Sequence, residues 1–233
     1  SDNQVKRWRD AKTAAARASD QGPVTALAFS PGGTRVAVGS MYGDITLWDC
    51  AAEKDIYSKR GHDKRITGVA FLPGGKRFVT ISVDQKVNLW DAATGRQLFE
   101  LDGHQNIVNT AVFSPDGNWV LTADQDNTAR LWDANAGKLV AELTEHTDVV
   151  NTARFSHEGK WIATASNDGT TRLWNVDAVR KAAANGQPAV SAFVLQSGPS
   201  MDARFSPADK GVVSTCNNPG SGHLQVARVF AVA

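Results

Sequence analysis

The chain has 233 residues, of which 42% are hydrophobic and 21% are charged, a composition typical of a soluble globular protein. Its 25 basic and 24 acidic residues give a formal net charge of +1, so the overall charge does not attract nucleic acid or an anionic membrane surface. No apolar run approaches the roughly 20 residues that cross a bilayer, and we expect neither nucleic-acid nor membrane partners.

Cysteine is rare in this sequence. Cys50 and Cys216 lie in no C-x-x-C pair and have no other metal-ligand residue types around them. Two isolated thiols are typical of a reducing compartment. We therefore expect a cytoplasmic location and no cysteine-bound metal.

Taken in chain order, the sequence repeats itself every 42 residues. The repeating types are Phe, His, Thr, Asp and Trp, too many to coincide by chance, and they indicate a tandem structural repeat. The positions are Phe29, Phe71, Phe113 and Phe155; His62, His104 and His146; Thr80, Thr122 and Thr164; Asp84, Asp126 and Asp168; and Trp48, Trp90, Trp132 and Trp174.

Within one copy, the pattern is that of short strands separated by turns. From Val108 onward, apolar and β-branched residues alternate with polar ones, which favours β-strands. Pro115 and Gly117 in "SPDG" and Gly137 in "NAG" supply turn conformations. We predict four antiparallel strands near residues 108–114, 119–124, 128–134 and 138–144.

Several copies depart from the pattern. The copy that ends at Trp48 lacks the His, Thr and Asp, and the last copy has Phe230 in place of Trp. Phe205 follows Phe155 after 50 residues instead of 42, so the chain carries an insertion behind Trp174. Asp177 as N-cap and Asn185-Gly186 as a stop signal predict one or two helical turns there, and the periodic phenylalanines, including Phe205, are expected to be core.

The motifs in these copies resemble those of the WD-repeat β-propeller family. "GHDKR" from Gly61 and "GHQNI" from Gly103 match the family's Gly-His pair, and "LWD" or "LWN" closes four copies. The resemblance extends over nearly the whole chain, and turns such as "FSPGG" are closest in style to bacterial members. It implies an all-β protein, a β-propeller of four-stranded antiparallel blades.

The repeat boundaries imply about five to five and a half repeats. The expected order is a partial blade over 1–20, blades over about 21–62, 63–104, 105–146 and 147–196, and a final incomplete blade over 197–233. A closed ring needs a whole number of blades, so the two ends could complete a fifth blade together. The chain opens inside a hairpin without an initiating Met, and its Ala-rich stretch over 11–19 is a poor strand. We favour a segment of a larger propeller, such as a seven-bladed one.

In the family, the His, a Thr or Ser, the turn Asp and the Trp form a buried chain of hydrogen bonds inside one blade. The same residue types could also make a nucleophilic triad or a zinc site. Such a site is needed once, whereas this set is copied into three blades, so we expect a structural role, no catalytic residue, and no metal or other cofactor. The resemblance assigns the structural role to His62, Thr80, Asp84 and Trp90; to His104, Thr122, Asp126 and Trp132; and to His146, Thr164, Asp168 and Trp174.

The resemblance also implies which positions contact a partner: the third and fifth residues after each His and the residue before each turn Asp. This set has one cation, no carboxylate and several apolar groups, which suits a protein or peptide better than phosphate or sugar. The positions are Arg65, Thr67, Val83, Ile107, Asn109, Gln125, Val149, Asn151 and Asn167, with Thr25, Met41, Met201 and Asn217 added by register.

Two functions remain open. We favour a non-catalytic protein–protein interaction scaffold or sensor domain, whose partner is a protein, a peptide or another domain of the same longer chain. The alternative is an enzymatic propeller, a hydrolase or lyase with acidic residues at the central channel. Such an enzyme should gather its non-periodic acids, but Asp63, Asp102, Glu145 and Asp148 lie in loops between repeats. We therefore expect that the protein is not an enzyme.

Overall fold

The computed structural model describes residues 4–9, 12–18, 22–196, 198–217 and 224–231, with side chains within 22–195 and 198–215. The chain forms two compact units, Ser1–Asp102 and Gly103–Ala233. The side chains of Cys216, Asn217 and Phe230 lie outside the described residues.

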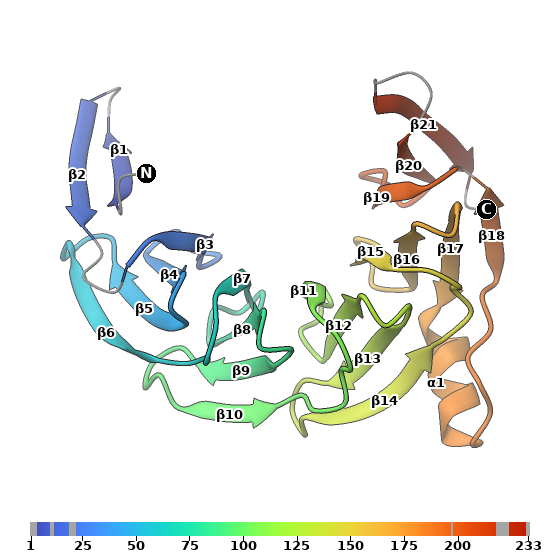
Figure 1. Cartoon of the computed structure of the whole chain (residues 1–233), viewed down its shortest axis with the longest axis horizontal. Helices are drawn as coiled ribbons and strands as arrows, with labels where there is room; N and C mark the ends of the chain where they lie inside the picture. Colours follow the sequence, from blue (N-terminus) through green and yellow to red (C-terminus); the bar gives the residue numbers. More distant parts are fainter. Residues whose placement is uncertain (1–3, 10–11, 19–21, 197, 218–223, 232–233) are drawn as a thin grey trace. The chain divides into compact units, whose positions relative to one another are not determined.

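Unit 1 contains one two-stranded and two four-stranded antiparallel sheets (Figure 1). In both four-stranded sheets the strands pair in chain order. The Ala-rich segment, which we predicted to be a poor strand, forms β2 by pairing with β1, so that prediction is wrong. The strands are β1 (Gln4–Arg9), β2 (Lys12–Ala18), β3 (Val24–Phe29), β4 (Arg35–Ser40), β5 (Asp44–Asp49), β6 (Lys54–Arg60), β7 (Ile66–Phe71), β8 (Arg77–Ser82), β9 (Val87–Asp91) and β10 (Gln97–Glu100).

Unit 2 contains two four-stranded sheets and one three-stranded sheet, again paired in chain order. A helix, α1 (Val176–Ala184), stands between the third and fourth strands of the second of these sheets (Figure 1). The strands are β11 (Val108–Phe113), β12 (Trp119–Asp124), β13 (Ala129–Asp133), β14 (Lys138–Leu143), β15 (Val150–Phe155), β16 (Trp161–Ser166), β17 (Thr170–Asn175), β18 (Phe193–Gln196), β19 (Ser200–Phe205), β20 (Gly211–Asn217) and β21 (Leu224–Ala231).

The predicted all-β architecture of repeated four-stranded antiparallel sheets is confirmed. In the copy that begins at Val108, strands β11 to β14 start and end within one residue of the predicted limits. The agreement is close because each strand ends at a residue with a defined turn conformation. Gly117, for example, has φ of 73° and donates its amide to the Ser114 carbonyl at 2.9 Å.

In three copies the Asp that follows the Trp closes the turn between the third and fourth strands. Asp133 Oδ1 accepts the amides of Asn135 and Ala136 at 2.7 and 2.9 Å. Asp49 and Asp91 accept two amides each in the same way. The recurring Trp-Asp pair therefore joins a core residue to a turn-forming one.

Neighbouring sheets of a unit pack face to face through apolar side chains. In unit 1, Phe71 on β7 packs against a buried cluster that includes Ala37 and Leu47 of the preceding sheet. Phe29 on β3 is 60% exposed, so the prediction that it belongs to the core is wrong. Phe71 is covered by the sheet β3–β6, whereas Phe29, on the first strand of that sheet, is not part of this cluster.

The helix α1 is longer than predicted and has a different N-cap. Asn175, not Asp177, caps it, because Asn175 Oδ1 accepts the Ala178 amide at 3.0 Å. At the other end, Gly186 adopts φ of 66° just past the helix, where a left-handed conformation favours glycine. Among the described residues, no helix has the length and apolar character needed to cross a membrane.

Candidate functional site

One copy of the repeat in unit 1 contains an unbroken chain of hydrogen bonds from the Trp to the turn Asp. Trp90 Nε1 donates to Thr80 Oγ1 at 2.8 Å, and His62 Nε2 lies 2.7 Å from the same oxygen. On the other side of the ring, His62 Nδ1 lies 3.0 Å from Asp84 Oδ2. Because a carboxylate only accepts, His62 donates from Nδ1, and its Nε2 accepts the Thr80 hydroxyl proton.

The sheet β15–β18 repeats this arrangement. Trp174 Nε1 donates to Thr164 Oγ1 at 3.0 Å, and the two ring nitrogens of His146 lie 2.7 Å from Thr164 Oγ1 and 2.7 Å from Asp168 Oδ2. Thr164 and Trp174 are both 0% exposed, so a substrate could not reach the hydroxyl. The network fastens the loop before the first strand to the second and third strands.

Burial lowers the pKa of both imidazoles. At His62 and at His146 the loss of solvation outweighs the attraction of the neighbouring carboxylate. Burial alone would raise the pKa of Asp84, but the charge of His62 and the amide donors of Lys86 and Asp63 outweigh it and lower that pKa. At neutral pH the folded protein therefore holds a neutral imidazole next to a carboxylate.

We expect the free energy of unfolding to fall as the pH drops below 6.5, the ordinary pKa of histidine. In that range the unfolded chain binds protons at His62 and His146 that the folded chain excludes, so stability must decrease with decreasing pH. A second decrease is expected below pH 3.8, because the folded-state pKa of Asp84 is lowered and the carboxylate loses its favourable pairing on protonation. Urea unfolding from about pH 8 to about pH 3 measures both. Greater stability just below pH 6.5 than above it would contradict neutral, buried imidazoles.

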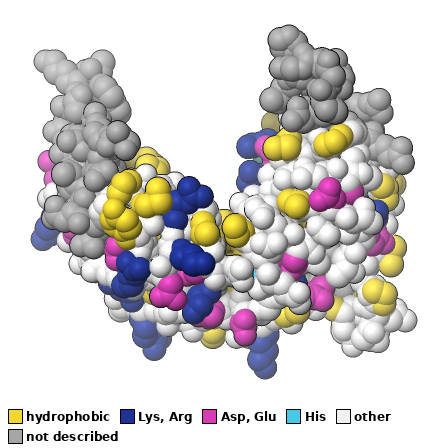
Figure 2. Space-filling view, in the orientation of Figure 1, with side chains coloured by type: hydrophobic (Ala, Val, Ile, Leu, Met, Phe, Trp, Pro, Cys, Tyr) yellow, Lys and Arg dark blue, Asp and Glu magenta, His cyan; other side chains and the backbone are white. Residues whose placement is uncertain are grey.

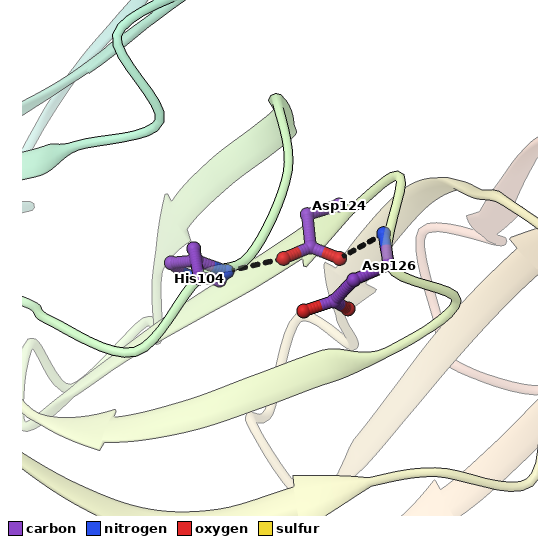
Figure 3. A group of neighbouring side chains, drawn as sticks. All are labelled: His104, Asp124 and Asp126. Carbon is purple, nitrogen blue, oxygen red and sulfur yellow. Dashed lines mark hydrogen bonds and ion pairs between the residues drawn. The ribbon is translucent and has the colours of Figure 1, made fainter.

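The middle copy, in the sheet β11–β14, departs from this pattern at the carboxylate. Trp132 Nε1 donates to Thr122 Oγ1 at 2.9 Å. The same Thr122 oxygen lies 3.0 Å from His104 Nε2. His104 Nδ1 lies 2.5 Å from Asp124 Oδ2 (Figure 3). The prediction that Asp126 pairs with His104 is therefore wrong, since Asp124 takes that place.

The position of Arg130 explains why Asp124, and not Asp126, pairs with His104. Its Nη1 lies 2.9 Å from Asp124 Oδ2, its Nη2 lies 2.8 Å from Asp126 Oδ2, and its Nε donates to Glu142 Oε1 at 3.0 Å. The pairing with Nη2 holds Asp126 away from the imidazole. The equivalent of Asp124 in the following copy is Ser166, whose hydroxyl is too short to reach a histidine in this way.

The two aspartates of this cluster differ in their ionisation. Burial raises the pKa of Asp124. Burial acts in the same direction on Asp126, but hydrogen bonds with Asp124, Thr128 and Arg130 outweigh it and hold the pKa of Asp126 well below its usual range. Asp124 is therefore the more easily protonated of the two carboxylates.

His104, Asp124 and Asp126 also offer three metal-ligand atoms within 4.8 Å of one another. Arg130 Nη1 already lies 2.8 Å from His104 Nδ1 and 2.9 Å from Asp124 Oδ2, so a bound cation would have to displace the guanidinium. Arg130 supplies the positive charge that the buried carboxylates need. The geometry favours a structural ion cluster over a metal centre.

The predicted partner-contact residues meet in sets at one end of each sheet, and we call them together the rim. The side chains of Arg65, Asn167 and Met201 are exposed, whereas those of Thr67, Val83, Ile107, Asn109, Gln125, Val149 and Asn151 are half-buried. In each set the residue before the turn Asp donates its backbone amide to a backbone carbonyl of the loop before the first strand. These bonds run from Val83 to Arg65 at 3.0 Å, from Gln125 to Ile107 at 3.1 Å and from Asn167 to Val149 at 3.0 Å.

Three polar rim residues use their side chains to bind the next sheet of their own unit, a role that we did not predict. In each case the acceptor is the first residue of the next sheet. A sequence signal exists, because this position is polar in four of five copies, with Met201 as the exception, which is more typical of the frame than of a variable contact surface. The bonds run from Thr25 Oγ1 to the Ile66 carbonyl at 2.6 Å, from Asn109 Nδ2 to the Val150 carbonyl at 2.9 Å, and from Asn151 Nδ2 to the Ser200 carbonyl at 2.8 Å.

The most open part of the rim in unit 1 combines apolar and basic side chains. Met41 and Tyr42, in the turn after β4, are 39% and 57% exposed. This turn touches the loop before β7, since a Cβ on Gly43 would lie 2.8 Å from the Lys64 carbonyl. Lys64 and Arg65 in that loop are exposed, and their side chains have no hydrogen-bond or ion-pair partner among the described residues. Figure 2 shows hydrophobic side chains next to Lys and Arg side chains on the surface of unit 1.

A comparison with known families gives a match that follows the repeat. The family of the WD domain, G-beta repeat (WD40), matches residues 15–49, 53–91, 95–133 and 137–175. A search of curated proteins returned no match. The four matches cover more than half of the chain and end at the same point of each copy, just behind the Trp. The chain therefore belongs to the WD40 repeat family, whose repeats generally mediate protein–protein interaction.

Proposed function

We propose that this protein is a non-catalytic interaction scaffold or sensor domain that binds a protein or peptide partner through the rim. The observation that carries the proposal is the open surface of unit 1, where the turn with the exposed Met41 and Tyr42 touches the loop that carries the exposed Lys64 and Arg65. Tyr and Arg are among the residues that contribute most to binding at protein interfaces. The partner is either a separate protein or another domain of a longer chain, and we place the interaction in the cytoplasm.

The chemistry of this surface also suggests what it binds. Two cations that form no ion pair among the described residues attract an acidic segment, and the exposed Met41 and Tyr42 offer apolar area to an aromatic or aliphatic side chain. We therefore propose an acidic peptide segment with one large apolar residue as the ligand of unit 1.

The hydroxyl–imidazole–carboxylate sets support a non-catalytic role, because they are closed to solvent. Thr80, Thr122 and Thr164 are each 0% exposed, and each accepts a hydrogen bond from a Trp indole. A nucleophile must reach its substrate. Turnover in a broad hydrolase and lyase screen, lost on substitution of the loop acids Asp63 or Asp148, would overturn this part of the proposal.

Selection from a random peptide library is the direct test of the rim. The protein is expected to enrich peptides in which Asp or Glu flanks an aromatic or aliphatic residue. Arg65→Glu should weaken binding of the selected peptides by about tenfold, since it replaces attraction by repulsion. Arg96→Glu is the matched control, because Arg96 is an exposed arginine in the turn between β9 and β10, outside the rim. Failure to enrich acidic peptides, or equal losses of their binding in both variants, would refute the proposed ligand.

A further inference from the structure

A groove of about 340 Å³ lies beside the last strand of the first sheet in unit 2. One wall is formed by Leu139–Glu142 and Thr144, on and just after β14, and the other by Ala183 and Gly186–Ala189, at the end of α1 and the turn after it. Figure 1 shows α1 next to β14. The volume is at the lower end of the range of about 300 to 1,000 Å³ for ligand sites. The groove shares no lining residue with the rim.

The strand wall of this groove is an open sheet edge. β14 is the last strand of its sheet and pairs only with β13 in the described residues. In an antiparallel ladder alternate backbone groups point to the neighbouring strand and away from it, so the outer edge of β14 presents amides and carbonyls toward the groove. Such an edge can accept another extended segment as an additional strand.

The second wall exists because of the insertion between β17 and β18. Val179 on α1 is 1% exposed and packs into the cluster that contains Leu143 of β14, so the helix is fixed against this sheet. Arg180 also lies over the Trp119 ring, 4.6 Å from its centroid. Among the described residues α1 is the only helix, so the strand edges β6 and β10 of unit 1 have no such wall.

The groove is lined by both apolar and polar groups and carries negative charge at one place. Leu139 is 45% exposed, and Val140 and Ala183 are half-buried. The only ionisable side chain among the lining residues is Glu142, whose carboxylate shares Arg130 with Asp124 and Asp126. One guanidinium does not balance three carboxylates. A cationic side chain in the groove would therefore be stabilised at Glu142.

We propose that this groove binds an extended peptide segment with small apolar side chains and a Lys or Arg, which adds as a fifth strand along β14. The backbone of the segment pairs with the open edge, its apolar side chains contact Leu139 and the α1 wall, and its cation pairs with Glu142. This charge preference is opposite to the one proposed for the rim, so the two sites select different ligands.

Synthetic fluorescent peptides that alternate valine with lysine, and matched peptides that alternate valine with glutamate, provide the test. In an Arg65→Glu background, which weakens the rim site, fluorescence anisotropy should show saturable binding of the lysine peptide and at least tenfold weaker binding of the glutamate peptide. Leu139→Lys and Glu142→Gln should each lower the affinity for the lysine peptide by about tenfold. Ile56→Lys is the matched control, because Ile56 is an exposed apolar residue of an outer strand, β6, without a helix wall.

Three results would overturn the proposal. One is the absence of saturable binding, and another is equal weakening by Leu139→Lys and Ile56→Lys, which would indicate nonspecific charge repulsion. The third is self-association of the protein in analytical ultracentrifugation that Leu139→Lys abolishes, since the groove would then hold a second copy of the chain. Arg65→Glu, the rim variant, should leave lysine-peptide binding unchanged, so failure at the rim and failure at the groove can be told apart.

Discussion

Replacing Arg130 with asparagine is expected to lower the free energy of unfolding by about 3 to 5 kcal/mol, the cost of removing one partner from a buried ion pair. Asp124 is 0% exposed, and its Oδ2 lies 2.9 Å from Arg130 Nη1. Without the Arg130 guanidinium, the buried Asp124 carboxylate loses its cationic partner and still lies next to Asp126. Urea denaturation of the wild-type and variant proteins measures the loss.

The chain contains its own controls for this prediction. The preceding copy has Ser82 and Asn88 at the positions of Asp124 and Arg130. The double substitution Asp124→Ser, Arg130→Asn therefore recreates an arrangement that this fold already tolerates, and it should recover most of the stability lost in Arg130→Asn. Arg172→Asn, at the equivalent arginine of the following copy, should cost about 1 kcal/mol or less, because Arg172 pairs with the partly exposed Glu145. Equal losses in the two arginine variants would mean that the buried carboxylate is not the cause.

Thr164→Val is expected to destabilise the protein by roughly 3 kcal/mol with almost no change in side-chain shape. The hydroxyl accepts from Trp174 Nε1 and donates to His146 Nε2, so its removal leaves two buried polar groups without a partner. Each such group costs about 1 to 3 kcal/mol. Thermal and urea unfolding, with near-ultraviolet circular dichroism to follow the indole environment, give the measurement.

Thr152 provides the matched control on the neighbouring strand. Its hydroxyl is buried and has no hydrogen-bond partner, so Thr152→Val removes an unsatisfied group and should be neutral or stabilising. The two substitutions have the same chemistry and lie in the same sheet. A loss of stability in Thr152→Val as large as that in Thr164→Val would show that packing, and not the hydrogen-bond chain, sets the cost.

Much of the fold could be predicted from the sequence because the repeat is local. The strand limits around Val108 follow from alternation and from turn residues such as Gly117, which act over a few positions. The same holds for the sets around Trp90 and Trp174, whose members are supplied by one repeat and the loop before it. Asn175 as N-cap of α1 was missed because Asn and Asp are equally good caps, and two positions competed for one helix start.

The sequence by itself determined the 42-residue frame: four antiparallel strands per copy, a buried Trp-Thr-His chain in three copies, and a turn-forming Asp after the Trp. Only the tertiary structure decided that Asp124 and not Asp126 pairs with His104, because that choice depends on where the Arg130 side chain ends. It also decided that Asn109 and Asn151 bind the next sheet, and that α1 stands against β14 and forms a groove. A periodic sequence fixes what each copy does within itself, but contacts between one copy and the next depend on distances that no single copy contains.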